Sequence, residues 1–565
     1  MTPVALTICA LAVAAVVAAL PATRAAVIRA FDRVRHPTPR QRAITATIVF
    51  AIAVTYLAFT AWQQDRDLIP KFHDEHMHLM QMRMLAHGKV WTRPHELAEF
   101  FETFHVFVKP VYASVYFPGT ALMYLPAVWL NLPFWLLPLL VAAGGAAMSY
   151  RVTAETIDGI AGLLAALMLV SLQWFRYLSM MVMSHSVMLL LGLFILWAWL
   201  RWRREHAMKW ALALGALAGW AAITRPVDAI CYTAPLGIAM LLDFRKLPIR
   251  KTAQIVACLV ATSSPFLSLQ LIENIGVTGH ALKTPYRLYA DLYTPQMSFG
   301  FHDFDPTIRP QTTLPQRQDY YDQFTIPAAA AHRPDRVLRT WATERFPLLA
   351  SVTLPNRLLV PLALLSVFAL TSKARVVTWA VLAVYVAFYS MFAYLLPVYC
   401  VVVAPVAIAW VLLGKDFLER WAARSPRLRD ATVTFLTAAA ALLSIAALPG
   451  VDREIIDDGF LAPTMWFSYV DAPNAVERPA IILFRYTPGD NTNEEPVYNV
   501  DVVNPDDAPI IRAHDLGPER NRKLFEYYAK RQPQRHVYLF DRRTRTLTPL
   551  GKVTDLVSKP ATSPG

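Results

Sequence analysis

The sequence predicts a mainly α-helical, polytopic membrane protein with a small α/β domain at its C-terminal end. Of its 565 residues, 55% are hydrophobic and only 17% are charged, whereas soluble domains typically carry about 25% charged residues. Up to residue 449, long apolar runs alternate with short clusters of lysine and arginine, which is typical of helices that cross a bilayer repeatedly. Residues 450–565 are polar and contain strand-like runs, which indicates a domain outside the membrane.

The net charge of +13 has a simple explanation in such a chain. In a soluble protein it would suggest binding to nucleic acid, but here the cations lie beside apolar runs, as the positive-inside rule expects. We therefore expect no nucleic-acid partner. The four cysteines all lie in apolar runs, so neither a disulfide framework nor a zinc site is predicted.

The first apolar run, residues 3–21, predicts an anchor helix. It resembles the core of a signal peptide, but no positively charged segment precedes it, so we do not expect cleavage. The arginine-rich stretch that follows should stay on the inner side of the membrane. Residues 1–42 are thus predicted to form an anchor helix and a basic cytoplasmic segment, with the N-terminus outside.

Residues 43–449 are predicted to form the membrane core, which brings the total to about twelve spans with both termini outside. Two large outer loops are expected at residues 63–115 and 273–346. A short apolar run at residues 116–130 predicts a juxtamembrane or half-inserted helix, because Asn131-Leu132-Pro133 interrupts it. The predicted core spans are 43–62, 134–150, 157–174, 180–200, 210–223, 229–242, 253–271, 358–370, 376–395, 398–413 and 432–448.

The C-terminal segment, residues 450–565, predicts a small extracytoplasmic α/β domain. Strand-like runs lie at residues 480–486 and 536–540, and residues 519–531 between them have a helical pattern. This domain could bind the acceptor, bind a partner or cover the site, and its residues do not decide between these roles.

The most unusual polar residues follow the span at 43–62, in Phe72-His73-Asp74-Glu75-His76-Met77-His78. An acidic pair at a membrane surface suits a general base that takes a proton from an acceptor. In a helix, Asp74 and His78 share one face, and the methionines and leucines that follow predict a helix along the membrane interface. The alternative is a solvated loop with ordinary charges. Asp74 and Glu75 could also hold a divalent metal ion together with a phosphate.

Further candidates are cations near the predicted outer side. Arg225, in Ile223-Thr224-Arg225-Pro226, lies at the outer end of a span, where a guanidinium needs a local partner such as a lipid phosphate. The alternative is that Arg225 snorkels to lipid headgroups. In the second outer loop, Lys283, Tyr286 and Arg287 could bind phosphate or sugar.

The order of several motifs resembles polytopic glycosyltransferases of the C fold, the superfamily of protein O-mannosyltransferases and the lipid A aminoarabinose transferase. The resemblance covers about residues 43–413. It rests on Asp74-Glu75 leading into Leu85-Ala86-His87-Gly88-Lys89, then Val115-Tyr116-Phe117-Pro118-Gly119, Met183-Ser184-His185, Thr224-Arg225-Pro226, Thr278-Gly279 with Pro285-Tyr286 and Gly300-Phe301, and Tyr394-Leu395-Leu396-Pro397.

This resemblance implies an enzyme that takes a sugar from a polyprenyl-phosphate donor. Asp74 would be the general base for an acceptor hydroxyl, which attacks the anomeric carbon and inverts it. Glu75 would position Asp74, the acceptor or a metal. The leaving phosphate would be held where charge develops in the transition state. The candidates for binding the substrate or the lipid phosphate are Arg225, Arg287, Tyr286, Lys109, Tyr116 and His78.

The resemblance also implies a bacterial inner (plasma) membrane protein with both termini on the periplasmic side. Its acceptor would be a glycan, lipid or protein of the cell envelope, and its other partners would be membrane lipids. Two rivals stay open. A lipid-linked glycan flippase or transporter would need ionisable residues within spans and broken helices. An O-antigen ligase or polymerase also joins polyprenyl-linked sugars, but it would not need the early Asp-Glu.

Overall fold

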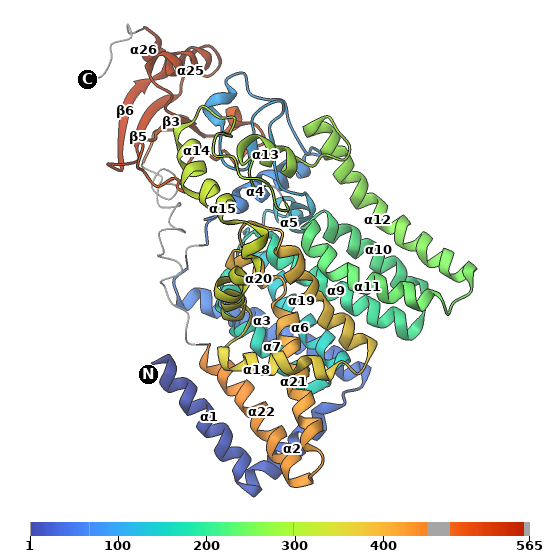
Figure 1. The fold of residues 1–565 in the computed structure, drawn as a ribbon. Coiled ribbons are helices and arrows are strands. Elements are labelled where there is room, and N and C mark those ends of the chain that lie inside the picture. The colour runs from blue at the N-terminus through green and yellow to red at the C-terminus, as the bar shows by residue number, and fades with distance from the viewer. Residues whose placement is uncertain (1, 67, 298, 449–474, 559–565) are drawn as a thin grey trace. The chain divides into compact units, whose positions relative to one another are not determined.

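The computed structural model describes residues 2–66, 68–297, 299–448 and 475–558 (Figure 1). The chain divides into two compact units. The membrane unit comprises residues 1–68, 133–269 and 333–452, and the loop unit comprises residues 69–132, 270–332 and 453–565. Segments from both predicted outer loops and from the C-terminal part of the chain therefore fold together in the loop unit.

Six of the described helices are long and apolar enough to cross a membrane, which makes this a multi-pass membrane protein. Two further helix pairs, bent by 94° and 103°, raise the number to eight if each pair is one span. The six are α3 (Pro39–Gln63), α6 (Leu136–Thr156), α9 (Ser184–Glu205), α11 (Pro226–Phe244), α12 (Ile249–Thr278) and the Leu428–Ala446 part of α22 (Pro426–Ala446). The bent pairs are α1 (Pro3–Ala19) with α2 (Pro21–Arg35), and Pro334–Thr353 with Arg357–Ala369.

The other four predicted spans are also helices, but they are shorter or more charged. Helices α7 (Gly159–Ser171), α10 (Met208–Ala222) and α19 (Lys373–Tyr389) have 13, 15 and 17 residues. Helix α21 (Ala404–Ala422) is long enough, but its C-terminal half carries Lys415 and three further charged residues. A helical segment begins at Pro334, within the residues predicted as the second outer loop.

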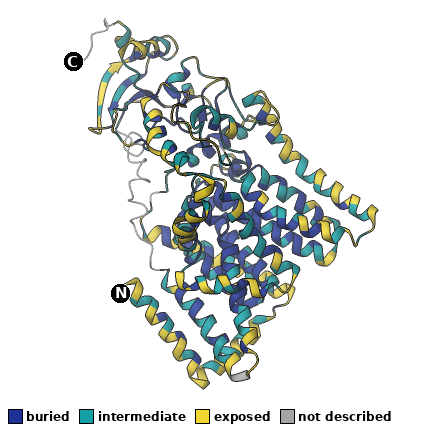
Figure 2. Cartoon of the chain, viewed as in Figure 1, coloured by how far each residue is buried: buried dark blue, intermediate teal, exposed yellow. Residues whose placement is uncertain are grey.

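Helix packing in the membrane unit depends on small residues at close contacts. Helix α6 packs against α3, α7 and α9, and α6 and α9 are the most buried of the long helices (Figure 2). Gly215 and Gly219 of α10 face α12, where an added Cβ on Gly219 would lie 2.8 Å from the Cα atom of Ser263. Any larger residue would push the two backbones apart, as at other small-residue helix contacts in membranes.

The C-terminal part of the loop unit contains a four-stranded sheet with the order β4-β3-β5-β6. Strand β3 (Ala480–Arg485) is parallel to β4 (Ile510–His514) and β5 (His536–Asp541), and β5 is antiparallel to β6 (Thr546–Lys552). Helix α25 (Pro518–Arg531) buries Leu524 and Tyr528. The predicted strands and helix are thus confirmed. Residues 450–474 and 559–565 of the predicted domain lie outside the described residues.

The first outer loop contributes α4 (His73–Ala86), η1 (Ala98–Phe101) and the pair β1 (Val106–Phe107) and β2 (Ala113–Ser114), and the apolar run predicted at residues 116–130 contains helix α5 (Gly119–Trp129). The second contributes α13 (Pro285–Tyr293), α14 (Pro315–Tyr320), η2 (Tyr321–Thr325) and α15 (Ile326–Ala331). In place of one structureless connector, each loop therefore holds several short elements.

Helix α4 is held in a protein core. Its Met77, Met80 and Met84 are almost fully buried and pack in one hydrophobic cluster with residues of the C-terminal sheet, such as Ile481 and Val537. The prediction of a helix was right, but the prediction that its apolar face lies along a membrane interface was wrong. A helix that packs on a sheet and a helix that lies along a membrane interface have the same apolar pattern, because sheet side chains and lipid tails are both apolar partners.

Candidate functional site

The N-terminus of α4 places Asp74 and Glu75 in the first helical turn, where carboxylates interact favourably with the helix dipole. Glu75 is 3% exposed, and its Oε1 atom accepts hydrogen bonds from the backbone N–H groups of Lys71 (2.8 Å) and Phe72 (3.3 Å). Glu75 therefore closes the start of the helix by satisfying N–H groups that have no partner within it.

Asp74 has a different environment from its neighbour. Its side chain is partly exposed, and the Tyr116 hydroxyl donates a hydrogen bond to its Oδ1 atom at 2.7 Å. Gln81, two turns further along α4, donates to the backbone carbonyl of Tyr116, and the His78 ring lies 5.3 Å from the Tyr116 ring. The structure thus brings together three predicted site residues, Asp74, Tyr116 and His78.

Three histidines surround this turn and stay neutral over a wide pH range. Burial, together with the neighbouring His105, lowers the pKa of His73 to about 3. Burial and the nearby His73 lower the pKa of His76 to about 3. Burial and the nearby Arg317 lower the pKa of His105 to about 3 as well. Because protonation would place a charge in this enclosed region, the imidazoles act here as neutral hydrogen-bonding and stacking groups.

The remaining predicted residues of the loop unit lie nearer the surface. Tyr286, at the start of α13, is 41% exposed and stacks on Phe117 with 6.4 Å between the ring centroids. Arg287 pairs with Asp291 at 2.9 Å, and Asp291 also pairs with Lys283 at 3.0 Å, so two cations share one carboxylate. Lys109 is exposed and makes no side-chain hydrogen bond or ion pair with a described residue, which leaves its ammonium group available to an anion.

Arg225 belongs to a polar network within the membrane unit. Its guanidinium group forms a salt bridge with Asp228 and hydrogen bonds with Ser184 (3.2 Å), His185 (3.1 Å) and the Tyr389 hydroxyl (3.2 Å). The predicted motifs Met183-Ser184-His185 and Thr224-Arg225-Pro226 therefore lie side by side. Arg225 is also 5.0 Å from the centroid of the Tyr399 ring.

Asp228, the local partner of Arg225, was not among the residues predicted from the sequence. Asp228 is 1% exposed and also accepts a hydrogen bond from Tyr389 at 3.0 Å. Its position could have been noticed, because it lies in the first turn of α11, three residues after Arg225, where a carboxylate is favoured. A lipid phosphate is thus not needed to explain why an arginine lies here.

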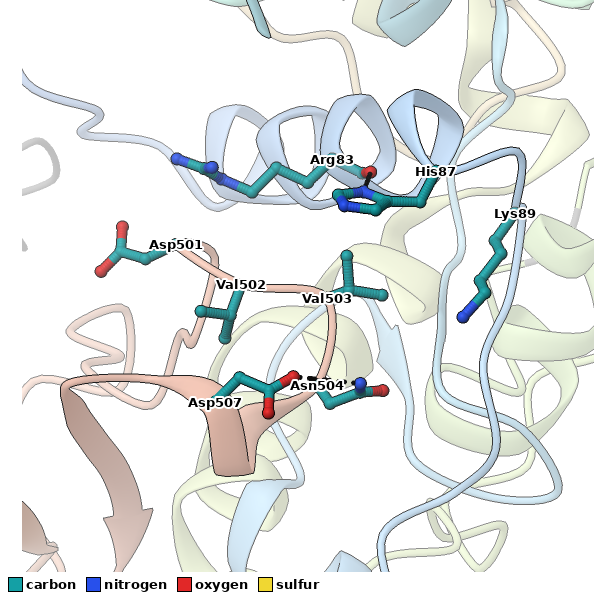
Figure 3. Close-up of a pocket in the computed structure, with 8 residues that line it drawn as sticks. All are labelled: Arg83, His87, Lys89, Asp501, Val502, Val503, Asn504 and Asp507. Atoms are coloured by element: carbon teal, nitrogen blue, oxygen red, sulfur yellow. Dashed lines mark hydrogen bonds between the residues drawn. The ribbon is translucent and has the colours of Figure 1, made fainter.

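A cavity of about 350 Å³ lies beside the C-terminal part of α4, about two turns and more from Asp74. Figure 3 shows Arg83, His87 and Lys89 on one side and Asp501 and other residues of the C-terminal segment on the other. The His87 ring is fixed by a hydrogen bond from its Nδ1 atom to the carbonyl oxygen of Arg83. Because its lining carries charges of both signs, this cavity does not select a ligand by charge.

The described residues do not form a recognisable metal site. No group of three or more histidine, cysteine, aspartate or glutamate side chains is arranged there to hold a metal ion. Asp74 and Glu75 are adjacent in sequence, but Glu75 is used to cap α4. The four cysteines are all free in this structure.

No protein-family model and no curated protein sequence matches the chain. Among solved structures, ArnT from Cupriavidus metallidurans bound to undecaprenyl phosphate is similar over 88% of this chain and 92% of its own, with 13% identity and a TM-score of 0.49. The Archaeoglobus fulgidus oligosaccharyltransferase in the apo form is similar over 87% of this chain and 69% of its own, with 12% identity and a TM-score of 0.44. Both are membrane glycosyltransferases of the C fold, and ArnT is the lipid A aminoarabinose transferase named in the sequence analysis.

Proposed function

We propose that the protein is an inverting glycosyltransferase that moves a sugar from a polyprenyl-phosphate donor to an acceptor hydroxyl at the outer face of the membrane. The main support is the first turn of α4. There, Glu75 closes the helix while Asp74 stays partly exposed, with one carboxylate oxygen held by Tyr116. No other described residue donates a hydrogen bond to Asp74, so its second oxygen remains available to take a proton.

In this proposal Asp74 is the general base. It removes the proton of the acceptor hydroxyl as the acceptor oxygen bonds to the anomeric carbon, and the bond from that carbon to the phosphate oxygen breaks. The lipid phosphate leaves on the opposite face of the sugar, so the configuration inverts. Tyr116 fixes the orientation of the Asp74 carboxylate, and a positioned base of this kind contributes about 10²–10⁴-fold to the rate.

The leaving lipid phosphate needs a cation, because negative charge develops on it in the transition state. We propose Arg225 for this role, with Lys109 as a second cation. Arg225 is held in a defined orientation by Asp228, Ser184, His185 and Tyr389. Its charge is shared with Asp228, so the electrostatic contribution of Arg225 alone is smaller than that of an unpaired arginine.

The donor in this proposal is a polyprenyl-phosphate-linked sugar, and the acceptor is a hydroxyl on a glycan, lipid or protein of the cell envelope. Tyr286 and His78 are further candidates for binding the substrate or the lipid phosphate in this proposal. The protein would be in a bacterial plasma membrane with both termini on the periplasmic side. No step in this mechanism requires a metal ion.

The test is sugar transfer in membranes, with polyprenyl-linked sugars extracted from the native host as donor. We expect Asp74→Asn to lower the rate by about 10²–10⁴-fold at normal expression. Asp555→Asn is the matched control, because Asp555 is an exposed carboxylate of the same unit, and it should transfer at the wild-type rate. Normal transfer by Asp74→Asn would falsify the assignment of the base.

A flippase of lipid-linked glycans is a second candidate, because one observation favours it. The membrane unit has two sharply bent helix pairs, and broken helices were expected of a transporter. In the same membranes, a flippase would move a labelled lipid-linked sugar across the bilayer and form no transfer product.

A further inference from the structure

His73, the residue before Asp74, forms a hydrogen bond with a residue of the C-terminal segment of the chain. His73 is the first residue of α4, and its Nδ1 atom lies 2.8 Å from the Tyr498 hydroxyl. A hydrogen bond from a segment more than 400 residues away thus holds the side chain that precedes the proposed base.

Tyr498 also contacts the next turn of the same helix. Its ring stacks on His76 with 4.6 Å between the centroids and an angle of 12° between the planes. His73 and His76 are three residues apart and lie on one side of α4, and Asp74 lies between them in sequence. The Tyr498 side chain therefore fixes the rotation, about the helix axis, of the turn of α4 that carries Asp74.

Tyr498 is itself well anchored. It is 2% exposed, and the next residue, Asn499, exchanges two hydrogen bonds with the backbone of Arg512, each of 2.9 Å. Arg512 is part of β4, so the position of Tyr498 is set by the sheet. A rigid element thus supports the contact, which is what a group needs in order to hold a reactive side chain within a narrow range of orientations.

The protonation state of the histidines suits this contact. Burial lowers the pKa of both His73 and His76 to about 3, so both rings are neutral near pH 7. A neutral His73 can accept the Tyr498 O–H at Nδ1, and a neutral His76 can stack on the phenol ring without a buried charge.

We propose that Tyr498 is a positioning residue, which holds the first turn of α4 through His73 and His76 and thereby orients Asp74 for proton transfer. This inference rests on the proposed function for the role of Asp74. It gives the C-terminal segment a part in the reaction: the segment acts through α4 and does not touch the substrate through Tyr498.

The test compares Tyr498→Phe with Tyr528→Phe in the full-length protein. Tyr498→Phe removes the hydroxyl that contacts His73 and keeps the ring on His76. Tyr528→Phe removes another buried hydroxyl of the loop unit, which donates to Asp506 at 2.6 Å. We expect Tyr498→Phe to lower kcat by about two- to tenfold, the range for one neutral hydrogen bond, with an unchanged KM for the donor. Tyr528→Phe should leave kcat as in the wild type.

A second measurement does not depend on activity. Hydrogen exchange of peptides covering residues 70–80 should become faster in Tyr498→Phe and stay as in the wild type in Tyr528→Phe. His73→Phe removes the other partner of the same hydrogen bond, so we expect a similar loss of kcat. The double variant should lose no more than either single one, because the two side chains share one interaction.

Wild-type kcat and wild-type exchange in Tyr498→Phe would overturn the inference. Additive losses in the double variant would also overturn it, because they would show that Tyr498 and His73 act separately. If the wild-type protein itself transfers no sugar, the proposed function fails, and the exchange experiment alone then decides whether Tyr498 positions α4.

Discussion

Two neighbouring carboxylates, Asp74 and Glu75, have different tasks because of the atoms around them. Glu75 is buried and accepts two backbone hydrogen bonds at the start of α4, while Asp74 is partly exposed and bound by one tyrosine hydroxyl. Adjacent residues of a helix point about 100° apart, so one side chain faces the preceding backbone and the other does not. A glutamine can still accept the two backbone hydrogen bonds, whereas an asparagine cannot replace a base.

We therefore expect opposite responses to amide substitution at the two positions. Glu75→Gln should keep most of the transfer activity, and Glu75→Ala should lose the cap and destabilise the loop unit by about 0.5–2 kcal/mol. Asp74→Asn, in contrast, should be as inactive as Asp74→Ala. The measurements are the transfer rate and the thermal unfolding midpoint of each purified variant. If Glu75→Gln were as inactive as Asp74→Asn, Glu75 would have a chemical role and not only a structural one.

In the membrane unit, the role of Arg225 also depends on the atoms around it, above all on Asp228. A partly buried arginine benefits from a nearby opposite charge, and Asp228 provides one within one helical turn. Tyr389 bridges the pair by donating to Asp228 and accepting from Arg225. This arrangement explains the arginine without any ligand, so its part in phosphate binding depends on activity measurements of substituted proteins.

At the scale of elements, α4 depends on partners from several segments. Its methionines pack against the C-terminal sheet, and His73 and His76 contact Tyr498. A fully buried methionine contributes about 1.5–3 kcal/mol, so this packing, more than helix propensity, stabilises a helix of only 14 residues. The orientation of Asp74 is thus a property of the whole cluster.

The buried histidines predict how the loop unit responds to pH. Histidines titrate near pH 6.5 in an unfolded chain, whereas burial lowers the pKa of His73, His76 and His105 to about 3 in the folded protein. Above about pH 6.5 the three histidines are neutral in both the folded and the unfolded chain, so they do not reduce the free energy of unfolding. As the pH falls from 6.5 towards 3, only the unfolded chain takes up these protons, so stability is lost progressively.

The measurement is the thermal unfolding midpoint between pH 7.5 and 4.5. His76→Phe keeps a ring on Tyr498 but cannot take up a proton, so its midpoint should fall less steeply with decreasing pH than that of the wild type. His87→Gln is the control, because His87 is exposed, and it should follow the wild type. If the unfolding midpoint of His76→Phe fell with decreasing pH as steeply as that of the wild type, buried His76 would not cause the loss of stability.

At the scale of the whole molecule, distant parts of the chain form one structural unit. The C-terminal segment contacts both outer loops within the loop unit: His95 binds Asp506 at 2.9 Å, and Gln316 donates to the carbonyl oxygens of Thr492 and Glu494. Burial alone would raise the pKa of Asp506, but hydrogen bonds from His95, Tyr528 and Tyr527 lower it to about 2. The C-terminal segment therefore packs into the same structural unit as the two outer loops and is not a separate domain.

We accordingly expect a chain that ends at residue 448 to lose the structure of α4. Without the sheet, Met77, Met80 and Met84 would be exposed to water, and hydrogen exchange of α4 should become fast. Exchange of α9 in the membrane unit provides the internal control and should stay slow. If α4 remained protected in the shortened chain, the C-terminal segment would be a separate domain.

Much of the architecture follows from local sequence patterns. Hydropathy identified the membrane helices, alternation identified β3 and β5, and periodicity identified α25 and α4, because each of these signals lies within a short stretch of chain. Six of the described helices, or eight with the two bent pairs, pass the length and composition test for a membrane span, and the other four predicted spans are shorter or more charged helices. The site was found only in part, through the position of Asp74 after a span and the order of the motifs.

The sequence by itself thus determined that this is a helical membrane protein with a small C-terminal α/β segment and an acidic pair at the start of a helix. Only the tertiary structure decided that Glu75 caps α4 and that Tyr116 binds Asp74. It also placed α4 in a protein core and joined Tyr498 to His73. The physical reason is separation along the chain: Tyr116 is 42 residues from Asp74 and Tyr498 is 425 residues from His73. Contacts between such distant residues leave no periodic signal in a single sequence.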